Sequence, residues 1–213
     1  MILKTIDAHT AGEPLRLIVE GFPRLEGRTI LEKRDDIRAR HDHLRRALML
    51  EPRGHADMYG ALLTEPERPG SHAGLLFMHN EGYSTMCGHG VIAVVTIGIE
   101  RGLLPLASEI VLDTPAGAIR ARPTMTAGQV ARVSFVNVPS FVLHGAVPVR
   151  LGARELRVDV AFGGAFYAIV DSEAAGIPIL PERLGELRKA GMAIKDAVER
   201  AVTLPDFGTC TKP

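Results

Sequence analysis

Residues 91–99 are apolar on every side, and this constrains the fold more than any other feature of the chain. The valines and isoleucines at positions 91, 92, 94, 95, 97 and 99 cover the whole circumference of a helical wheel. A helix that is hydrophobic all round needs packing partners on all sides. Arg101, Gly102 and Pro105 follow it, and these residue types commonly end a helix. The sequence therefore predicts a buried central helix.

Short strand patterns flank this helix on both sides in the sequence. The strands predicted before it are residues 2–7, 15–20, 57–64 and 74–79. The strands predicted after it are residues 109–114, 118–122, 130–138, a pair around Gly152, and 165–170. One buried helix among many short strands favours an α+β fold in which a curved sheet encloses the helix.

Two further segments have the period of amphipathic helices. Residues 33–48 are predicted to form one helix, whose buried stripe is Ile37, His41, Leu44 and Leu48. Residues 181–202 are predicted to form the other, with Leu184, Leu187, Ile194 and Val198 facing inward. We place a boundary at Ala127-Gly128, which gives a first lobe of residues 1–127 and a partial second lobe of residues 128–213.

Composition excludes several classes of function. The 25 basic and 25 acidic residues cancel, so there is no electrostatic case for nucleic acid or for an anionic membrane surface. No apolar run approaches the roughly 20 residues of a membrane span, and the start of the chain is strand-like rather than signal-like. Two widely spaced cysteines form neither a disulfide framework nor a zinc pattern. We expect a cytoplasmic protein in a reducing compartment.

Cys87 is the candidate for chemistry. It lies where the apolar helix is predicted to begin, and free N–H groups and the positive end of a helix dipole favour a thiolate there. Gly88 and Gly90 allow a ligand to approach the backbone, and His89 could hydrogen-bond to it. A buried structural cysteine followed by turn glycines is an equally good interpretation of these residues alone.

Other polar clusters carry weaker signals. His41 and His43 are two residues apart on a predicted helix, so they point to different sides and are not expected to share a metal ion. The loops at residues 7–14 and 53–60 hold His, Asp and Arg or Glu side chains that either belong to a site or brace the loops. Gly163 and Gly164 precede an aromatic strand, where they either line a small pocket or make a bulge.

Four segments together resemble the proline racemase family. They are D-A-H-T-A-G-E-P-L-R, E-P-R-G-H-A-D-M-Y-G-A, H-N-E-G-Y-S-T-M-C-G-H-G and V-D-V-A-F-G-G-A-F-Y-A. The resemblance implies a diaminopimelate-epimerase-like fold with two pseudo-symmetric lobes, each a curved sheet around a central helix, the second lobe being incomplete. It also implies an active site between the lobes that uses neither a cofactor nor a metal.

The same resemblance implies roles for three residues. Cys87 would be the catalytic acid/base that moves the Cα proton of a proline-like imino acid. The backbone at Gly88 and His89 would hold the substrate carboxylate, and the His89 side chain would lie near the ring nitrogen. Fixed N–H donors suit this chemistry, because negative charge develops beside the carboxylate. A Cys–His hydrolase is less consistent with the sequence, because no third group that would orient the histidine is evident.

The residues in these segments are more similar to those of the trans-3-hydroxy-L-proline dehydratase branch than to those of the racemase branch. A racemase or epimerase needs a second cysteine in a motif of the form D-R-S-P-[C/T/S]-G-T, whereas the dehydratase has threonine there. That motif is not in this sequence, and Cys210 in G-T-C-T-K-P lacks its flanking residues. We therefore expect a chain truncated before the second motif. The alternatives are a proline racemase or hydroxyproline 2-epimerase and an inactive truncated member, with a homodimer as one assembly open to it.

Overall fold

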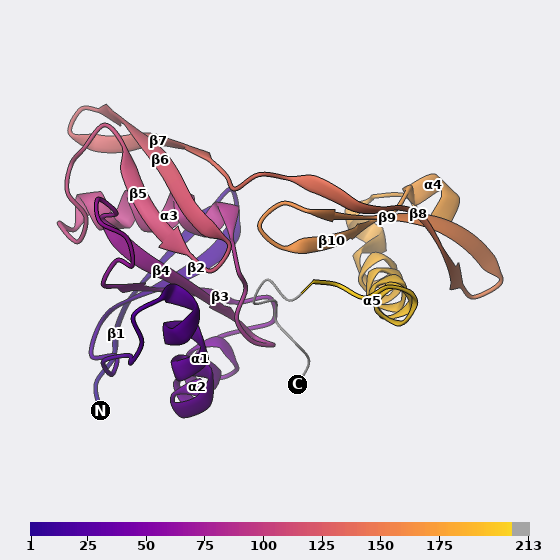
Figure 1. The fold of residues 1–213 in the computed structure, drawn as a ribbon, viewed down its shortest axis with the longest axis horizontal. Helices are drawn as coiled ribbons and strands as arrows, with labels where there is room; N and C mark the ends of the chain where they lie inside the picture. Colours follow the sequence, from indigo (N-terminus) through magenta and orange to yellow (C-terminus); the bar gives the residue numbers. More distant parts are fainter. Residues whose placement is uncertain (206–213) are drawn as a thin grey trace. The chain divides into compact units, whose positions relative to one another are not determined.

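The computed structural model describes residues 1–205, which fall into two compact units (Figure 1). Residues 1–138 form the first unit and residues 139–205 belong to the second. Within the described part of the chain, no helix is both long enough and apolar enough to cross a membrane.

The first unit contains a seven-stranded sheet in which the strands lie in sequence order. The strands are β1 (Lys4–Thr10), β2 (Glu13–Glu20), β3 (Tyr59–Thr64), β4 (Ala73–His79), β5 (Ile110–Thr114), β6 (Gly117–Thr126) and β7 (Gln129–Val136). The pairs β2–β3 and β4–β5 are parallel, and the other neighbours are antiparallel. The predicted strands of this unit are confirmed, apart from shifts at their ends.

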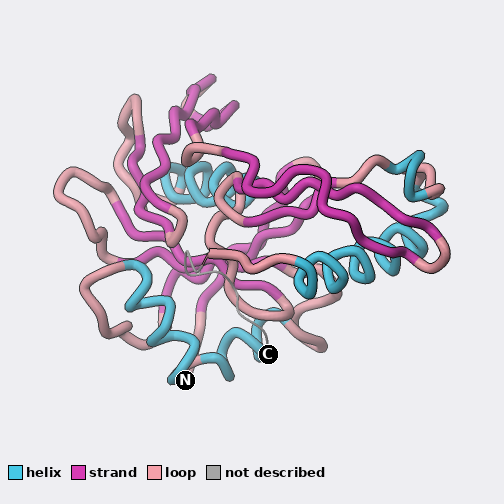
Figure 2. The backbone as a smooth tube through the Cα atoms, turned by 45° about the vertical axis from the view of Figure 1, so that its right-hand side comes forward, coloured by secondary structure: helices cyan, strands magenta, loops and turns pink. Residues whose placement is uncertain are grey.

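Helix α3 (Gly88–Glu100) is the predicted central helix. It contacts β1 and β7, the two edge strands of the sheet, as well as β2, β3 and β6. A sheet whose opposite edges touch one helix must curl around it, as the path of the strands shows (Figures 1 and 2). Most of the helix is buried. The half-buried residues are Gly88 and His89 at its start and the stripe of Ile92, Thr96 and Ile99, and Glu100 at its end is exposed.

The single helix predicted for residues 33–48 is wrong, because the structure has two helices there. Helix α1 (Ile30–Arg40) ends at His41, whose N–H bonds to the carbonyl of Ile37, and α2 (Asp42–Met49) begins at the next residue. The break lets the Asp42 carboxylate reach Arg45 and Tyr83. The apolar stripe survives the break, since Ile37, Leu44 and Leu48 are all buried.

Helix α1 begins with a capping box. The Thr29 hydroxyl accepts from the N–H of Glu32, and the Glu32 carboxylate accepts from the N–H of Thr29. This exchange satisfies two N–H groups at the helix start that would otherwise lack partners.

The second unit has a three-stranded antiparallel sheet covered by a helix. Its strands lie in the order β10 (Phe166–Ile169), β9 (Arg154–Phe162) and β8 (Phe141–Leu151). They are followed by α4 (Ser172–Ala175), the 3-10 turn η1 (Pro181–Arg183) and α5 (Leu184–Ala201). Helix α5 packs on β8 and β10, and the core includes Ile194 and Val198 as predicted.

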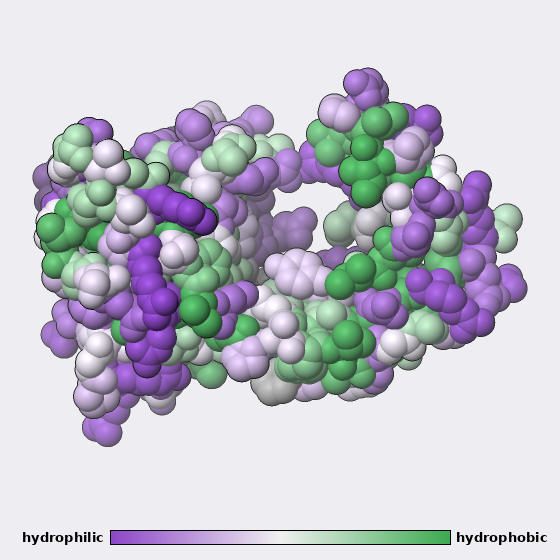
Figure 3. All heavy atoms as spheres, turned by 90° about the horizontal axis from the view of Figure 1, so that it is seen from above, coloured by the Kyte–Doolittle hydropathy of each residue, from purple (hydrophilic) through white to green (hydrophobic). Residues whose placement is uncertain are grey.

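Leu184 was predicted to face inward, and this is wrong. Leu184 lies in the first turn of α5, and 58% of its surface is exposed. The buried stripe runs through Ala190, Ile194 and Val198 and extends only to the half-buried Leu187. Exposed apolar residues are frequent on this unit and contribute to the green areas on the right of Figure 3. The exposed aliphatic residues of this unit include Val142, Ile169, Ile179, Leu180 and Leu184, and the Tyr167 side chain is also exposed.

The two units do not divide at the predicted boundary. Ala127 and Gly128 form the tight turn between β6 and β7, with φ angles of 50° and 80°. Strand β7 pairs with β6 and so belongs to the first sheet, and the units divide after Val138. Turn residues with positive φ mark hairpins as readily as they mark links between domains, which accounts for the difference.

Asp113 on β5 organises the loop between β3 and β4. Its carboxylate accepts from the N–H groups of Glu67 and Arg68 at 2.8 and 3.0 Å and from the Ser71 hydroxyl at 2.9 Å. Only 1% of the surface of Asp113 is exposed. The loop in turn supplies the Glu67 carboxylate that accepts from the N–H of Ile30 at the start of α1. A single buried carboxylate therefore ties β5 to the loop and, through the loop, to α1.

We predict that Asp113→Ala lowers the free energy of unfolding by about 2–4 kcal/mol, because several donors lose a buried charged acceptor. Urea denaturation followed by circular dichroism measures this. Glu20→Ala is the control, since its ion pair with Lys4 is exposed and should contribute less than about 1 kcal/mol. Equal losses in the two variants would contradict the role given to Asp113.

Candidate active site

Cys87 is the N-cap residue of α3, as the sequence suggested. Its backbone is extended, with φ −148° and ψ 110°, and the helix begins at Gly88. Cys87 is buried, with 7% of its residue surface exposed. The thiol therefore lies at the positive end of a helix that the curled sheet holds in place.

The first N–H groups of α3 have different partners. The N–H of Gly90 hydrogen-bonds to the Cys87 sulfur. The N–H groups of Gly88 and His89 have no acceptor among the described residues. Both residues are half-buried rather than sealed in the core. Two adjacent free donors at a helix start form a site suited to a carboxylate.

Gly90 also explains why the motif needs a second glycine. A Cβ atom at Gly90 would lie 2.7 Å from Cε1 of Phe77 and 3.0 Å from the Cys87 sulfur. A Cβ atom at Gly88 would meet only the end of the Phe135 ring, at 3.3 Å. The glycine at position 90 is therefore required for close packing of the sulfur against the helix start.

His89 is held on both sides by neighbouring groups. Its Nε2 lies 3.3 Å from the carbonyl oxygen of Pro14, and its Nδ1 lies 3.3 Å from the Cys87 sulfur. A carbonyl can only accept, so Nε2 carries the proton in that contact and Nδ1 of the neutral ring can accept from the thiol. The Thr10 hydroxyl donates to the His89 carbonyl at 3.0 Å. The segment of residues 7–14, predicted as a loop, is a hairpin of β1 and β2, and this hairpin positions His89.

Tyr59 belongs to the same cluster, and the sequence interpretation did not single it out. Its hydroxyl donates to the Ser84 hydroxyl at 2.6 Å. Its ring stacks on His79 with centroids 5.5 Å apart and meets the His89 ring edge-on at 5.1 Å. Strand periodicity alone could not identify it, because the contacts join β3 to β4, to α3 and to the segment before α3.

The Cys87 thiol is not activated in this structure, contrary to the expectation drawn from the helix start. Burial raises its pKa to about 11, and the charge of Glu13 adds to this increase. Hydrogen bonds from the Gly90 N–H and from Tyr59 act in the opposite direction. Desolvation of the thiolate outweighs both donors, so the thiol is the resting form at neutral pH.

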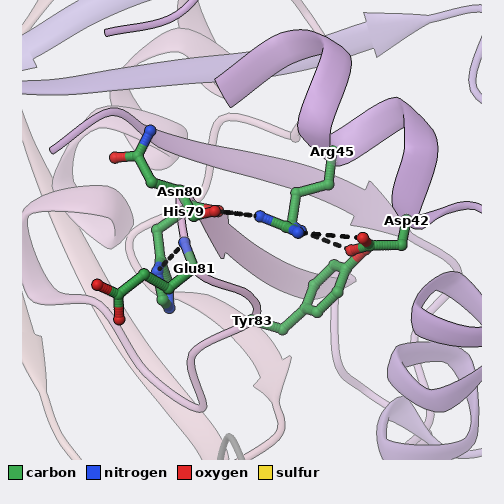
Figure 4. A network of polar contacts seen from close by, with 6 residues as sticks. All are labelled: Asp42, Arg45, His79, Asn80, Glu81 and Tyr83. Atoms are coloured by element: carbon green, nitrogen blue, oxygen red, sulfur yellow. Dashed lines mark hydrogen bonds and ion pairs between the residues drawn. The ribbon is translucent and has the colours of Figure 1, made fainter. Parts of the chain in front are cut away.

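A network around Arg45 supports the segment that leads to Cys87 (Figure 4). The buried Arg45 guanidinium donates to the Asp42 carboxylate and to the carbonyls of His79 and Asn80. The Tyr83 hydroxyl donates to the same carboxylate at 3.1 Å. The network joins α2 to the turn that follows β4.

Asn80 connects this turn to the loop at residues 53–60. Its side-chain amide donates to the carbonyls of Met49 and His55 at 2.7 and 2.9 Å. Among the described contacts, the His55 carbonyl therefore fixes the loop by accepting from Asn80. This contact agrees with the second interpretation of the loop, in which its residues brace the structure.

The histidine pair at positions 41 and 43 has no metal-binding geometry in the described structure. The His41 and His43 rings have centroids 6.4 Å apart because the helix breaks at His41. Within residues 1–205, no group of three His, Cys, Asp or Glu side chains is arranged to hold a metal ion. Gly163 and Gly164 lie in the second unit, between β9 and β10. Cys210 lies outside the described residues.

We predict a pH dependence of stability that comes from Cys87. Its folded pKa is raised from 9.0 to about 11, so its contribution is complete below pH 9 and is lost as pH rises through 11. The free energy of unfolding should fall by about 2 kcal/mol more in the wild type than in Cys87→Ala over this range. Urea denaturation at several alkaline pH values tests this. Parallel pH curves for the two proteins would contradict the assignment.

Comparison with known proteins agrees with the motifs. Residues 5–210 match the family model described as proline racemase. A trans-3-hydroxy-L-proline dehydratase of Bacillus cereus is 48% identical over 201 residues, covering 93% of this chain and 60% of the relative. A proline racemase of Clostridioides difficile is 39% identical over 206 residues, covering 95% of this chain and 62% of the relative.

Solved structures show the same fold. A hydroxyproline epimerase of Agrobacterium vitis, solved with bound trans-4-hydroxy-L-proline, matches with a TM-score of 0.90 and 28% identity. The match covers 96% of this chain and 62% of that one. The chain thus spans about 60% of the length of the relatives it matches. On the extent of the family match and the identity to these relatives, the chain belongs to the proline racemase family.

Proposed function

We propose that this chain contains the Cys87 half of the active site of a cofactor-independent enzyme. The enzyme would remove the Cα proton of a proline-like imino acid. The observation that carries the proposal is the pairing of a buried thiol with two free N–H groups at the start of α3. The N–H groups of Gly88 and His89 would hold the substrate carboxylate, which brings Cα towards the sulfur. The proposal gives Cys87, Gly88 and His89 the roles that the family resemblance implies.

The 48% identity to the trans-3-hydroxy-L-proline dehydratase of B. cereus favours trans-3-hydroxy-L-proline as the substrate. In the proposed reaction, the Cys87 thiolate takes the Cα proton while the N–H donors stabilise the negative charge that develops beside the carboxylate. The C3–O bond then breaks, and the leaving hydroxide takes up the proton that Cys87 removed, which gives water and restores the thiolate. The resulting enamine tautomerises to the cyclic imine 1-pyrroline-2-carboxylate. The side chain of His89 would lie near the ring nitrogen.

Racemisation or epimerisation is the second candidate. It is favoured by the match to the C. difficile racemase and by the likeness to the A. vitis epimerase. It requires a second acid/base on the opposite face of Cα, because the proton must be returned there. The dehydratase is preferred because the B. cereus relative is 48% identical and the racemase 39%. A cytoplasmic, reducing location and assembly as a homodimer belong to the same proposal.

Product analysis tests the proposal. The 213-residue chain, and a version extended to the length of the relatives, are incubated with trans-3-hydroxy-L-proline, trans-4-hydroxy-L-proline or L-proline. We expect the cyclic imine from the first substrate only, and a loss of at least about 100-fold in Cys87→Ala, because general-base catalysis contributes that much. Ser172→Ala, which lies outside the four motif segments, is the control and should keep full activity.

Three outcomes are informative for the proposal. Inversion at Cα of proline or of trans-4-hydroxy-L-proline, without imine from trans-3-hydroxy-L-proline, would replace the dehydratase by the racemase or epimerase. Imine formation that survives in Cys87→Ala would contradict the role of the thiol. Activity in the extended version alone would show that residues outside this sequence complete the site.

A further inference from the structure

Tyr59 is fixed so that its hydroxyl group lies between two acceptors. The ring is held by stacking on His79 and by its edge-on contact with His89. Its hydroxyl donates to Ser84 at 2.6 Å, and its side chain also hydrogen-bonds to the Cys87 sulfur. Ser84 and Cys87 stand on the same short segment before α3. The phenol therefore bridges them from β3, the strand that begins at Tyr59.

A phenol has one proton, so it can donate fully to only one of these two acceptors at a time. While Cys87 is a thiol, its sulfur is a weak acceptor and the Ser84 oxygen is the better one. Once Cys87 is a thiolate, its sulfur becomes a charged acceptor, and hydrogen bonds to charged groups are roughly twice as strong. The preferred acceptor of the Tyr59 proton thus depends on the state of Cys87.

We propose that Tyr59 is a switchable hydrogen-bond donor that stabilises the Cys87 thiolate, with Ser84 as its acceptor when Cys87 is a thiol. The switch is a rotation of the phenolic O–H about its C–O bond, and no proton leaves Tyr59. Tyr59 is in this account a positioning residue that acts through Cys87. Its catalytic use rests on the proposed function, but its effect on the thiol does not.

The other groups that face Cys87 do not make this donor redundant. Glu13 on β2 disfavours the thiolate, and the Gly90 N–H is a fixed donor that favours it. His89 on α3 presents Nδ1 at 3.3 Å and Nε2 at 3.6 Å to the sulfur, but its ring is held by the contact of Nε2 with the Pro14 carbonyl at 3.3 Å, so its N–H cannot rotate freely as an O–H can. His79 on β4 stacks on the Tyr59 ring. Among these groups, Tyr59 is the side chain whose donor can turn towards the sulfur as the charge forms.

The test is the ionisation of Cys87 in the 213-residue chain, without substrate. Tyr59→Phe keeps the ring and its contacts but removes the proton, so the thiolate fraction at a pH well below the pKa should fall about tenfold. Ser84→Ala removes the competing acceptor, so the thiolate fraction should rise. Tyr167→Phe is the matched control, because Tyr167 is 57% exposed on β10 and should change nothing.

Two readouts separate ionisation from access to the sulfur. The rate of iodoacetamide alkylation is followed by peptide-resolved mass spectrometry, which distinguishes Cys87 from Cys210. The ultraviolet absorbance of the thiolate is measured as the difference between each variant and its Cys87→Ser counterpart. Circular dichroism and urea denaturation of every variant establish that it is folded.

Opposite shifts in Tyr59→Phe and Ser84→Ala support the switch. An unchanged or increased thiolate fraction in folded Tyr59→Phe would overturn it. A decrease in Ser84→Ala would also overturn it, because Ser84 would then be a supporting donor rather than a competitor, and this variant decides the matter if Tyr59→Phe does not fold. A shifted ionisation in a protein without imine formation would contradict the proposed function and leave the inference standing.

Discussion

The packing of α3 inside the curled sheet is the constraint on which the rest of the first unit depends. Both edge strands of the sheet contact this one helix, so the helix cannot shift without disturbing the sheet. Its rigidity fixes a thiol at its first turn, together with two N–H groups that have no acceptor within residues 1–205. A site that binds and deprotonates a small acid needs such preorganised donors, because they then stabilise new charge without having to reorganise.

The same burial creates a conflict at Cys87. A base must be available as a thiolate, but removing the sulfur from water raises its pKa to about 11. The structure offsets part of this cost with the Gly90 N–H and with Tyr59. A bound carboxylate at Gly88 and His89 would add negative charge close by, so these donors matter more, not less, once substrate is present. The ionisation of Cys87 therefore depends on the hydrogen-bond donors around it as well as on the thiol itself.

Sequence reasoning succeeded where a local pattern determines the outcome. The all-apolar segment predicted α3 and its burial, and the residues after it predicted where the helix ends. It failed where a tertiary contact overrides the local pattern. At the break after α1, the Asp42 carboxylate accepts from Tyr83, which is distant in the sequence, and the turn at Ala127 leads into the pairing of β7 with β6. No periodicity records either of these contacts.

The candidate site also contains residues that the sequence predicted and residues that it did not. The motif around Cys87 gave the thiol and its two neighbours, because they are consecutive in the chain. Tyr59 was missed, because only the fold brings it to Ser84 and His89. The direction of the Cys87 pKa was also missed, since a helix start favours the thiolate while the burial that opposes it is a property of the whole sheet.

The central claim is that the free N–H groups at the start of α3 hold a carboxylate beside Cys87. Amide nuclear magnetic resonance of the 213-residue chain, titrated with trans-3-hydroxy-L-proline and with its carboxamide, tests this most directly. The account predicts saturable shifts of the Gly88 and His89 amide signals with the imino acid and much smaller shifts with the carboxamide. Equal shifts with both compounds, or none at these two amides, would contradict it.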